Sequence, residues 1–383
     1  MRPDEEGFPQ PHIELSLCAD CGLCRHLCPV NSKEVDRNTE DLNEDVKKPL
    51  EVYAAWHLDE TIRQESSSGG VFTALAESIL AQGGVVVGAA FDEHLVVRHM
   101  AVDRSADLHR LRGSKYVQSQ ISPALYRQIR DLLQQRRPVL FSGVPCEVAG
   151  LRAFLARRYD DLYCCDLVCH GVPSPYFFAR YVRYYTQNGN HLVGLSFRDK
   201  TTGWKNYSIR QHMKDGHSRL FAIFADPYMI AFLRNYALRR ACYTCKFAST
   251  IRTGDLTLGD FWGVGKEYPD YDRDDEGTSL VLVNSRKGHT WLDICQSSLF
   301  LGQANLNASI VDNPTLVHPT SSSPQRNTFY LDLNTMSFAE FVREHHLYPP
   351  SVACCIMAAV KRWLLAICRR AYAVLRFVEG EAP

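Results

Sequence analysis

Four closely spaced cysteines near the start of the chain form the clearest chemical pattern in the sequence. Residues 18–29 read Cys-Ala-Asp-Cys-Gly-Leu-Cys-Arg-His-Leu-Cys-Pro, a C-x2-C-x2-C-x3-C-P run. Such a run wraps its thiolates around a cubane iron–sulfur cluster, whereas zinc sites usually pair two C-x2-C knuckles across a longer loop. We therefore predict a 4Fe-4S cluster, in preference to zinc or disulfides, at Cys18, Cys21, Cys24 and Cys28.

The last cysteine of this run has two alternative roles. In chains with two such runs, the fourth cysteine ligates the other cluster, but this chain has a single run. Cys28 therefore either completes the cluster of its own run or reaches across to a second cluster.

Two successive predicted strands each deliver a cysteine beside glycine and proline. A buried strand over 139–141 runs into a Gly/Pro turn and places Cys146 at the start of a helix over 148–157. A thiol at a helix N-terminus is expected to have a lowered pKa, which suits a ligand or a nucleophile. The next strand, 162–168, delivers Cys169-His-Gly-Val-Pro. Functional groups gather at the carboxyl ends of strands in α/β folds, so the two thiols are able to converge.

A second knuckle, Cys242-Tyr-Thr-Cys245, completes a further set of four thiols. Four thiolates suffice for another cubane cluster. We predict this cluster at Cys146, Cys169, Cys242 and Cys245. The alternatives are a zinc site, or two unrelated core thiols plus a knuckle. Buried cysteine is common as a small apolar side chain, so the remaining six are interpreted as structural: Cys164, Cys165, Cys295, Cys354, Cys355 and Cys368.

Two polar segments have the composition of an anion-binding site. Ser66-Ser-Ser-Gly-Gly70 precedes a predicted helix over 71–82, and a Ser/Gly turn that opens a helix offers free N–H groups to a phosphate. The alternative is an ordinary helix cap. Arg112-Gly-Ser-Lys-Tyr-Val-Gln-Ser119 interleaves cationic, hydroxyl and aromatic groups. This segment either binds an anionic cofactor or forms a surface loop.

Composition limits the class of protein. The chain has 383 residues, enough for two domains or one large domain with an appendage. Lys and Arg number 43, as do Asp and Glu, so no bulk positive charge favours nucleic acid as a partner. The amino terminus has no apolar signal-peptide region. With 14 cysteines and no visible export signal, we expect metal or redox use in the cytoplasm.

Strands and helices alternate from Glu51 onward, which predicts an α/β (mixed α+β) main domain. The predicted strands are 51–56, 85–91, 139–141, 162–168, 193–199, 204–212, 255–258 and 278–284. The predicted helices are 71–82, 148–157, 175–188, 228–238 and 288–298. Residues 31–48 read as an exposed polar linker, and residues 303–350 show few clear signals.

The end of the chain predicts one amphipathic helix over 351–377, after Pro349-Pro350. Its basic residues fall on one half of a helical wheel and its apolar residues on the other. No apolar run reaches transmembrane length. Such a helix either makes peripheral contact with an acidic membrane surface or packs on its own domain or on another subunit.

Seven motifs, in the expected order, make the chain resemble the coenzyme F420 hydrogenase/dehydrogenase beta-subunit family, which includes 7-hydroxymethyl chlorophyll a reductase. The matching pieces are Ser66–Phe72, Gly83–Phe91, Gly113–Ser119, Ser142–Cys146, Cys169–Pro175, Cys242–Ala248 and Gly254–Gly263. With the cysteine run, the resemblance covers residues 18 to about 285.

The resemblance implies an iron–sulfur flavoprotein oxidoreductase. Electrons would pass between a ferredoxin-like module, an inner 4Fe-4S cluster and FAD, which would exchange electrons or hydride with a small-molecule substrate. A ferredoxin or another oxidoreductase subunit is the implied redox partner. The resemblance assigns the flavin to Ser67, Ser68, Gly69, Gly70, Gly113, Ser114, Lys115, Tyr116, Gln118 and Ser119. Candidates for contact with the flavin, substrate or cluster are Lys115, His170 and Asp260, each with a structural role as the alternative.

The implied organisation has four parts. They are a truncated 4Fe-4S ferredoxin-type module and tether (1–48), the N-terminal and C-terminal parts of the beta-subunit-like domain (51–130 and 131–345), and the amphipathic tail (350–379). Many bacterial members carry two ferredoxin-type runs, and residues 7–14 resemble the spacer between them. Either one run has been lost here or the true start lies upstream of Met1.

Two other functions remain open from the residues alone. The chain is alternatively a non-catalytic electron-transfer subunit whose clusters serve a partner enzyme, or a zinc-stapled protein with no redox role. The substrate, the use of F420 and the oligomeric state are not specified by the sequence.

Overall fold

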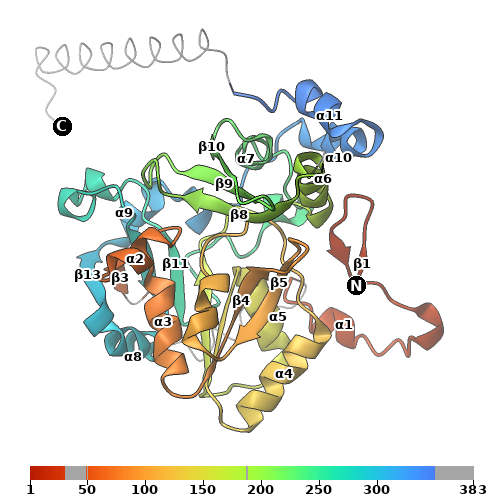
Figure 1. Ribbon diagram of the computed structural model, residues 1–383. Coiled ribbons are helices and arrows are strands. Elements are labelled where there is room, and N and C mark those ends of the chain that lie inside the picture. Colours follow the sequence, from red (N-terminus) through yellow and green to blue (C-terminus); the bar gives the residue numbers. More distant parts are fainter. Residues whose placement is uncertain (31–48, 50, 187–188, 350–383) are drawn as a thin grey trace, which may run out of the picture.

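A computed structural model describes residues 1–30, 49, 51–186 and 189–349. Its centre is a mixed sheet of eight strands, which Figure 1 shows together with the helices that cover it. In spatial order the strands are β13 (Leu299–Ala304), β3 (Glu51–His57), β12 (Ser279–Val283), β11 (Leu256–Asp260), β7 (Leu162–Leu167), β6 (Val139–Gly143), β4 (Val85–Phe91) and β5 (Val97–Val102).

The middle of this sheet is parallel and its flanks are antiparallel. Strands β11, β7, β6 and β4 run in one direction, while β12, β3, β13 and β5 pair antiparallel with their neighbours. The carboxyl ends of the four parallel strands therefore share one edge of the sheet, where α/β folds place their functional groups.

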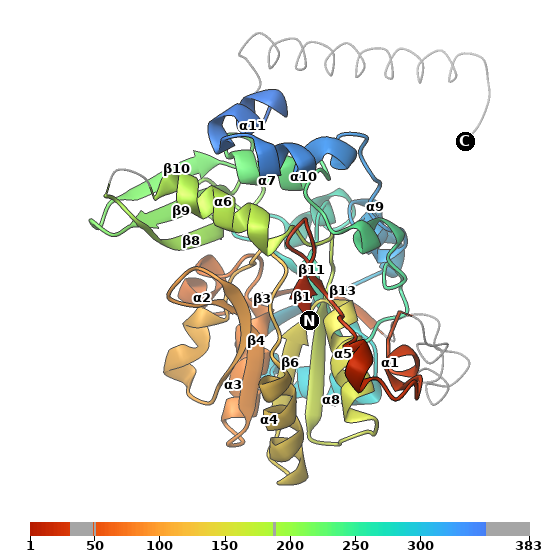
Figure 2. The same cartoon turned by 90° about the vertical axis from the view of Figure 1, so that its right-hand side faces the viewer.

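Helices cover both faces of the main sheet. On one face lie α3 (Val71–Leu80) and α8 (Arg286–Ile294), whose apolar side chains join one core cluster with strand residues. On the other face lie α4 (Pro123–Gln134) and α5 (Pro145–Leu155). Figures 1 and 2 show the three layers from two sides. Apolar residues four apart, Leu125, Ile129 and Leu133, explain why α4 packs on the sheet along one side.

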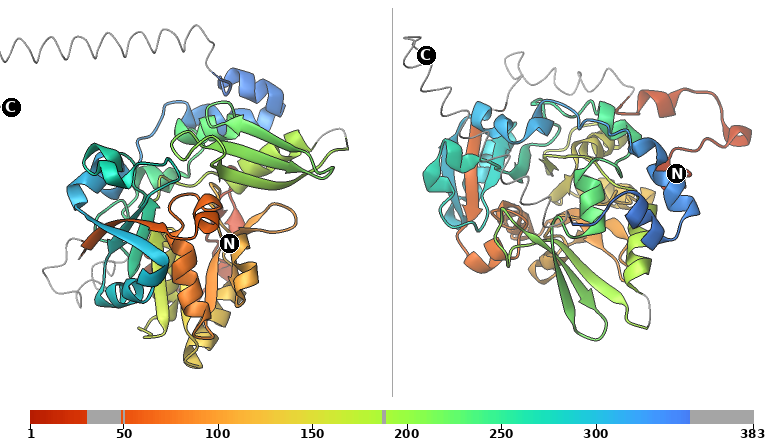
Figure 3. Two further views of the ribbon diagram at one scale, coloured as in Figure 1. Left: turned by 60° about the vertical axis from the view of Figure 1, so that its left-hand side comes forward. Right: turned by 90° about the horizontal axis from the view of Figure 1, so that it is seen from above.

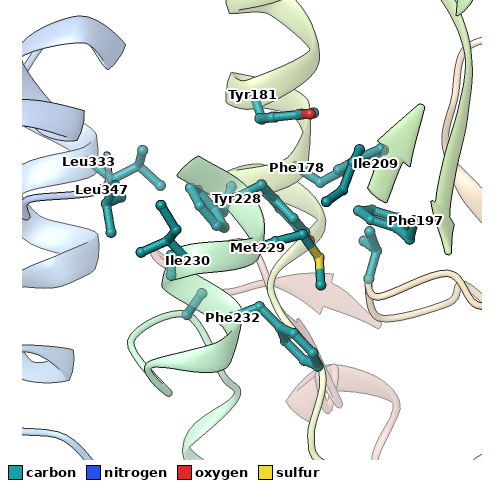
Figure 4. Packing of buried hydrophobic residues seen from close by; sticks show 14 of the residues in the cluster. Phe178, Tyr181, Phe197, Ile209, Tyr228, Met229, Ile230, Phe232, Leu333 and Leu347 are labelled. Carbon is teal, nitrogen blue, oxygen red and sulfur yellow. The ribbon is translucent and has the colours of Figure 1, made fainter. Parts of the chain in front are cut away.

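A smaller layer lies over the carboxyl edge of the main sheet, as the two views in Figure 3 show. It contains the antiparallel strands β8 (Leu192–Asp199), β9 (Ser208–Met213) and β10 (Ser218–Ala222), with α6 (Pro175–Tyr185), α7 (Pro227–Leu233), α10 (Arg326–Thr335) and α11 (Phe338–Glu344). Figure 4 shows aromatic and aliphatic side chains from this layer packed against one another. The rings of Phe177 and Tyr228 stack with centroids 4.7 Å apart, and Phe329 meets Phe177 edge-on at 5.1 Å.

The first ten residues are attached to this upper layer. Phe8 is buried, and its ring lies 5.7 Å from that of Tyr330. Glu6 forms an ion pair with the buried guanidinium of Arg326, with Nη1 to Oε1 at 2.9 Å. Gly7 has a φ of +83°, and a Cβ there would lie 2.2 Å from the Cβ of Tyr176, so only glycine fits between the two segments.

The remaining elements are short. They are β1 (Arg2–Pro3), β2 (Pro9–Gln10), η1 (Leu15–Leu17), α1 (Leu23–His26), α2 (Glu60–Gln64), η3 (Ser105–Arg110), η4 (Arg240–Thr244), η5 (Val264–Lys266), η6 (Pro269–Tyr271), η7 (Gln296–Ser298), α9 (Leu306–Val311) and η8 (Pro314–Leu316).

The mixed α/β main domain is confirmed, with several corrections to its elements. Residues 303–350, which lacked clear signals, contain α9, α10 and α11. The strand predicted over 204–212 begins only at Ser208, because the preceding residues form a turn. The helix predicted over 228–238 ends at Leu233, and Cys295 lies at the cap of α8 rather than within it.

The predicted linker at 31–48 and the predicted tail helix, with Cys354, Cys355 and Cys368, lie outside the described residues. Within the part that the structure describes, no helix has both the length and the apolar character needed to cross a membrane.

Candidate functional site

Three segments bring the predicted inner cysteine set together at the carboxyl edge of the sheet. Cys146 lies in the first turn of α5, just after β6, and Cys169 follows β7 by two residues. Cys242 and Cys245 lie in and just after η4. The four thiols are near enough that each of the other three raises the pKa of the Cys146 thiol. The predicted convergence of strand ends therefore occurs in the fold.

Burial disfavours the thiolate form of three cysteines of this set. Burial, with Glu147 and the other three thiols, raises the pKa of Cys146 well above its usual value. Burial likewise raises the pKa of Cys169 and Cys242. The lowered pKa expected for Cys146 at a helix N-terminus is thus wrong, because burial, Glu147 and the neighbouring thiols all raise it. Cys146 nevertheless keeps exposed surface.

Backbone N–H groups face two of these sulfur atoms. Gly171 donates a backbone hydrogen bond to the Cys169 thiol, and Val172 donates one to the Cys242 thiol. Gly171 has a φ of +132°, and a Cβ there would lie 2.8 Å from Leu238 and 3.3 Å from the Cβ of Cys242. Only glycine lets the two chains approach this closely. N–H groups directed at cysteine sulfur are one of the means by which proteins tune iron–sulfur clusters.

A buried carboxylate fixes the segments that carry the thiols. Asp166, on β7, is fully buried and accepts six hydrogen bonds. Its Oδ1 accepts from Arg252 Nη2 at 2.9 Å, from Arg252 Nε at 3.2 Å and from the Thr257 hydroxyl at 2.6 Å. Its Oδ2 accepts at 2.9 Å from the Thr253 N–H, the Thr253 hydroxyl and the Gly254 N–H. Every lone pair of this buried charge is satisfied.

The partners of Asp166 reach all three cysteine segments. Arg252 donates to the carbonyl of Leu167, two residues before Cys169, and to that of Phe247, two residues after Cys245. The Thr253 hydroxyl lies 3.0 Å from the carbonyl of Pro145, the neighbour of Cys146. One buried ion pair therefore sets the relative position of the inner thiols.

The N-terminal cysteine run lies on the same side of the molecule. Cys18, Cys21 and Cys24 are exposed and Cys28 is half-buried. Figure 2 shows α1 beside α5, and Lys246 Nζ donates to the carbonyl of Val30 at 2.7 Å. The run is thus adjacent to the inner set. Among the described residues, no three His, Cys, Asp or Glu side chains form a group that could hold a metal ion as they stand.

A hollow of about 310 Å³ lies between the strand ends and β8. This volume is near the lower end of the usual range for ligand pockets, about 300–1,000 Å³. Its walls include Phe91, Arg112, Ser114, Lys115, Leu195 and Phe197. Aromatic faces and cationic groups thus line one concave site.

Sequence comparison decides the family. The profile described as coenzyme F420 hydrogenase/dehydrogenase, beta subunit N-term, matches residues 52–126, and the profile for the C terminus of the same beta subunit matches residues 136–307. Together they span more than half of the chain. The chain belongs to the coenzyme F420 hydrogenase/dehydrogenase beta-subunit family. The resemblance drawn from the seven motifs is confirmed.

Other comparisons add little to this beta-subunit assignment. No curated protein matches the chain. Among solved structures, a chain of the xenon-derivatized F420-reducing NiFe hydrogenase complex from Methanosarcina barkeri aligns over 76% of this chain and 94% of its own length. Its sequence identity is 14% and the TM-score is 0.47, a likeness that decides neither function nor fold.

In this beta-subunit fold, the two segments assigned to the flavin lie against each other. The Ser67 hydroxyl oxygen accepts from the Ser114 N–H at 2.7 Å and lies 3.0 Å from the Ser114 hydroxyl. Gly69 is enclosed: its N–H donates to Ser279 Oγ, and a Cβ would lie 2.3 Å from the Ala55 carbonyl oxygen. Gly70 is the N-cap of α3, which has no side-chain cap. The start of α3 therefore keeps N–H groups without a side-chain partner.

A buried arginine that is not among the predicted site residues joins the two segments assigned to the flavin. Arg198 pairs with Asp260 through two bonds of 2.7 and 2.9 Å, and it also donates to the Ser67 carbonyl and the Tyr116 hydroxyl. Trp204 Nε1 donates to the same carboxylate at 2.8 Å. Burial opposes the charge of Arg198, but Asp260 outweighs it and raises the pKa. Asp260 is thus held in an ion pair that positions Arg198.

Two lysines near the flavin segments bond to carbonyl oxygens rather than carboxylates. Lys115, on the wall of the hollow, donates to the carbonyls of Arg110 and Arg112 at 3.1 and 2.6 Å. Lys200 is buried and donates to the Ser68 carbonyl at 2.9 Å. Burial lowers the pKa of each lysine to about 7. The charge on this side of the hollow therefore depends on pH near neutrality.

Two further predicted site residues, His170 and Ser119, have hydrogen-bond partners in the fold. His170 Nε2 donates to Asn235 Oδ1 at 2.7 Å, and burial lowers the pKa of the imidazole. Ser119 Oγ lies 2.7 Å from His99 Nδ1, while His99 Nε2 donates to the Ser142 carbonyl. His99 therefore bridges the second flavin segment and the turn before Cys146. Neither Arg198 nor His99 belongs to a recognisable sequence motif. Each is identified only by its position in the fold.

Proposed function

We propose that this beta-subunit-family protein is an iron–sulfur flavoprotein that transfers electrons between an N-terminal cluster, an inner cluster and FAD. The observation that carries the proposal is the convergence of Cys146, Cys169, Cys242 and Cys245 from three segments. Burial and the neighbouring thiols raise the pKa of Cys146, Cys169 and Cys242, and the thiolates would repel one another once ionised, so a cationic iron–sulfur core would stabilise them together.

The order of the carriers follows from which segments touch. Val30, two residues after the N-terminal run, accepts a hydrogen bond from Lys246, the neighbour of Cys245 in the knuckle. The inner set lies next to the flavin segments, because His99 connects Ser119 to the turn preceding Cys146. Electrons would therefore enter or leave at the exposed run, cross the inner cluster and reach the flavin.

The hollow beside Ser114 and Lys115 is our candidate for the flavin ring. Its aromatic walls suit a planar ring, and the pairing of Ser67 with Ser114 joins the two segments that would hold it. When bound, FAD converts one-electron traffic from clusters into two-electron chemistry. Lys115, charged below a pH of about 7, would favour added negative charge on the ring. The start of α3, at Gly70, would receive a phosphate.

The proposed setting has a redox partner at the exposed run and a small-molecule substrate at the flavin. The partner is a ferredoxin or another oxidoreductase subunit, and the location is the cytoplasm. A non-catalytic relay is the second candidate. It is favoured by the exposure of Cys18, Cys21 and Cys24, which suits contact with another protein.

Metal and flavin analysis tests the proposal. Anaerobically purified protein should contain about eight irons and one FAD per chain, given about four irons per cubane. Cys18→Ser and Cys242→Ser should each remove about half of the iron, which assigns one cluster to each set. Zinc in place of iron, with no flavin, would overturn the proposal. Clusters without flavin would leave the relay function in its place.

A further inference from the structure

Three functional segments meet at one arginine that none of the motifs assigns. The guanidinium of Arg239 donates to Gln118 Oε1 at 3.1 Å, in the second flavin segment. It also donates to Gln10 Oε1 at 3.0 Å, in the N-terminal segment, and lies 5.9 Å from the ring of Phe8. One side chain thus holds both segments.

The backbone of the same residue belongs to the inner cysteine set. The Arg239 N–H donates to the Val172 carbonyl at 2.9 Å, three residues after Cys169. Its carbonyl accepts from the Cys242 N–H at 2.8 Å, which starts the η4 turn. A shift of Arg239 would therefore move Cys242 relative to Cys169.

The charge of Arg239 acts on that set. Its guanidinium has no carboxylate ion-pair partner within the described residues, since both of its side-chain bonds go to neutral amides. The neighbouring Arg240 differs, because it is largely exposed and lies 3.4 Å from Glu6. An unpaired, half-buried cation beside Cys242 is screened less than an exposed one.

We propose that Arg239 is a positioning residue that ties the N-terminal and flavin segments to the inner cysteine set and raises the reduction potential of the cluster held there. The inference rests on the proposed function, because it needs a cluster at Cys146, Cys169, Cys242 and Cys245. A cluster gains negative charge on reduction, and a fixed positive charge nearby stabilises the reduced state. The two amide bonds hold that charge in place.

Potentiometric titration of the clusters, followed by their spectra, tests the inference with three variants. Arg239→Gln removes the positive charge, and its shorter side chain extends less far toward the amides of Gln118 and Gln10. Arg239→Lys keeps the charge but cannot bridge both amides. Arg240→Gln is the matched control, since it removes an adjacent, exposed charge. Iron content is measured for each variant, so that potentials are compared only between equally loaded proteins.

We expect Arg239→Gln to disfavour reduction of one cluster about tenfold, a fall of about 59 mV for a one-electron couple. The reduction potential of Arg239→Lys should fall by no more than half as much as that of Arg239→Gln. Arg240→Gln should keep the wild-type potential. The same cluster should lose its signal in Cys242→Ser. Equal potentials in wild type and Arg239→Gln would overturn the inference, as would an equal fall in Arg240→Gln or Arg239→Lys.

Failure of the inference and failure of the proposed function give different results. If wild-type protein has no signal that depends on Cys242, the inner cluster is absent and the proposed function fails first. If that signal is present and loaded Arg239→Gln leaves its potential unchanged, the proposed function stands and only the role of Arg239 is wrong. If Arg239→Gln loses iron, the reduction potentials of Arg239→Lys and Arg240→Gln are compared instead. A potential that falls more in Arg240→Gln than in Arg239→Lys overturns the inference.

Discussion

Asp166→Asn should loosen the inner cysteine set more than any other single isosteric change near it. The carboxylate accepts six hydrogen bonds from Arg252, Thr253, Gly254 and Thr257. An amide of the same shape offers one acceptor oxygen, and its NH2 group would face N–H or O–H donors. The buried Arg252 would also lose its counter-charge.

The expected cost follows from that arrangement. Breaking a buried ion pair by neutralising one partner costs about 3–5 kcal/mol of unfolding free energy, because the other charge stays buried. Both side chains here are almost fully buried, so solvent does not reduce the penalty. Because Arg252 and Thr253 also hold Leu167, Phe247 and Pro145, the loss should reach the inner thiols as well as overall stability.

Urea unfolding and iron analysis together check this prediction. Asp166→Asn should lower the unfolding free energy by about 3–5 kcal/mol and lose iron from the inner set faster than wild type. Asp161→Asn is the matched control. Asp161 Oδ2 lies 3.6 Å from Nη1 of Arg136, which is exposed, and such a surface ion pair contributes at most about 1 kcal/mol to stability. If Asp166→Asn does not fold, Thr257→Val removes one of the six bonds together with the acceptor of Asn284 Nδ2, at about 1–3 kcal/mol. A loss no greater than that of Asp161→Asn would refute the reasoning.

Three further predictions concern pH, the flavin and the N-terminal run. Burial raises the pKa of Asp226 to about 6, so its contribution to stability declines as the pH rises from about 4 to about 6. Asp226→Asn should therefore gain about 3 kcal/mol on wild type between pH 4 and 7 in urea titrations, whereas a difference independent of pH would contradict this. FAD affinity should fall as the pH rises through about 7, and Lys115→Gln should flatten that dependence in fluorescence titrations; an unchanged slope would remove Lys115 from the site. No side chain of residues 11–30 is buried, so we expect the proposed cluster to order this segment, and chelation should speed tryptic cleavage at Arg25; equal rates with and without metal would show that the segment folds alone.

The sequence alone predicts the parallel strands at the centre of the sheet and the Gly/Pro turns that follow them. Apolar runs bounded by Gly and Pro identified β4, β6 and β7 and the cysteines that follow two of them. These signals are local: a buried strand needs a continuous apolar run, and a sharp turn needs glycine or proline. The upper layer was harder, since α10 and α11 bury aromatic residues against α6 that are distant in sequence.

The chemistry of single residues depended on the fold. Cys146 has the local context that lowers a thiol pKa, yet burial beside three other thiols raises it. Asp260 is, from the sequence, a candidate for contact with the flavin or substrate, yet in the fold Arg198 and Trp204 occupy both of its oxygens. Arg239 has no motif, and its two amide partners lie at positions 10 and 118. Contacts of this sequence separation leave no periodic pattern in the chain.

Stopped-flow mixing with a reduced ferredoxin tests whether electrons reach the flavin through the inner cluster. Loss of oxidised-flavin absorbance is followed in wild type and in Cys242→Ser at equal FAD content. We predict that the flavin of wild type is reduced and that Cys242→Ser slows this reduction at least tenfold while its N-terminal cluster is still reduced. Equal rates of flavin reduction in the two proteins would contradict it.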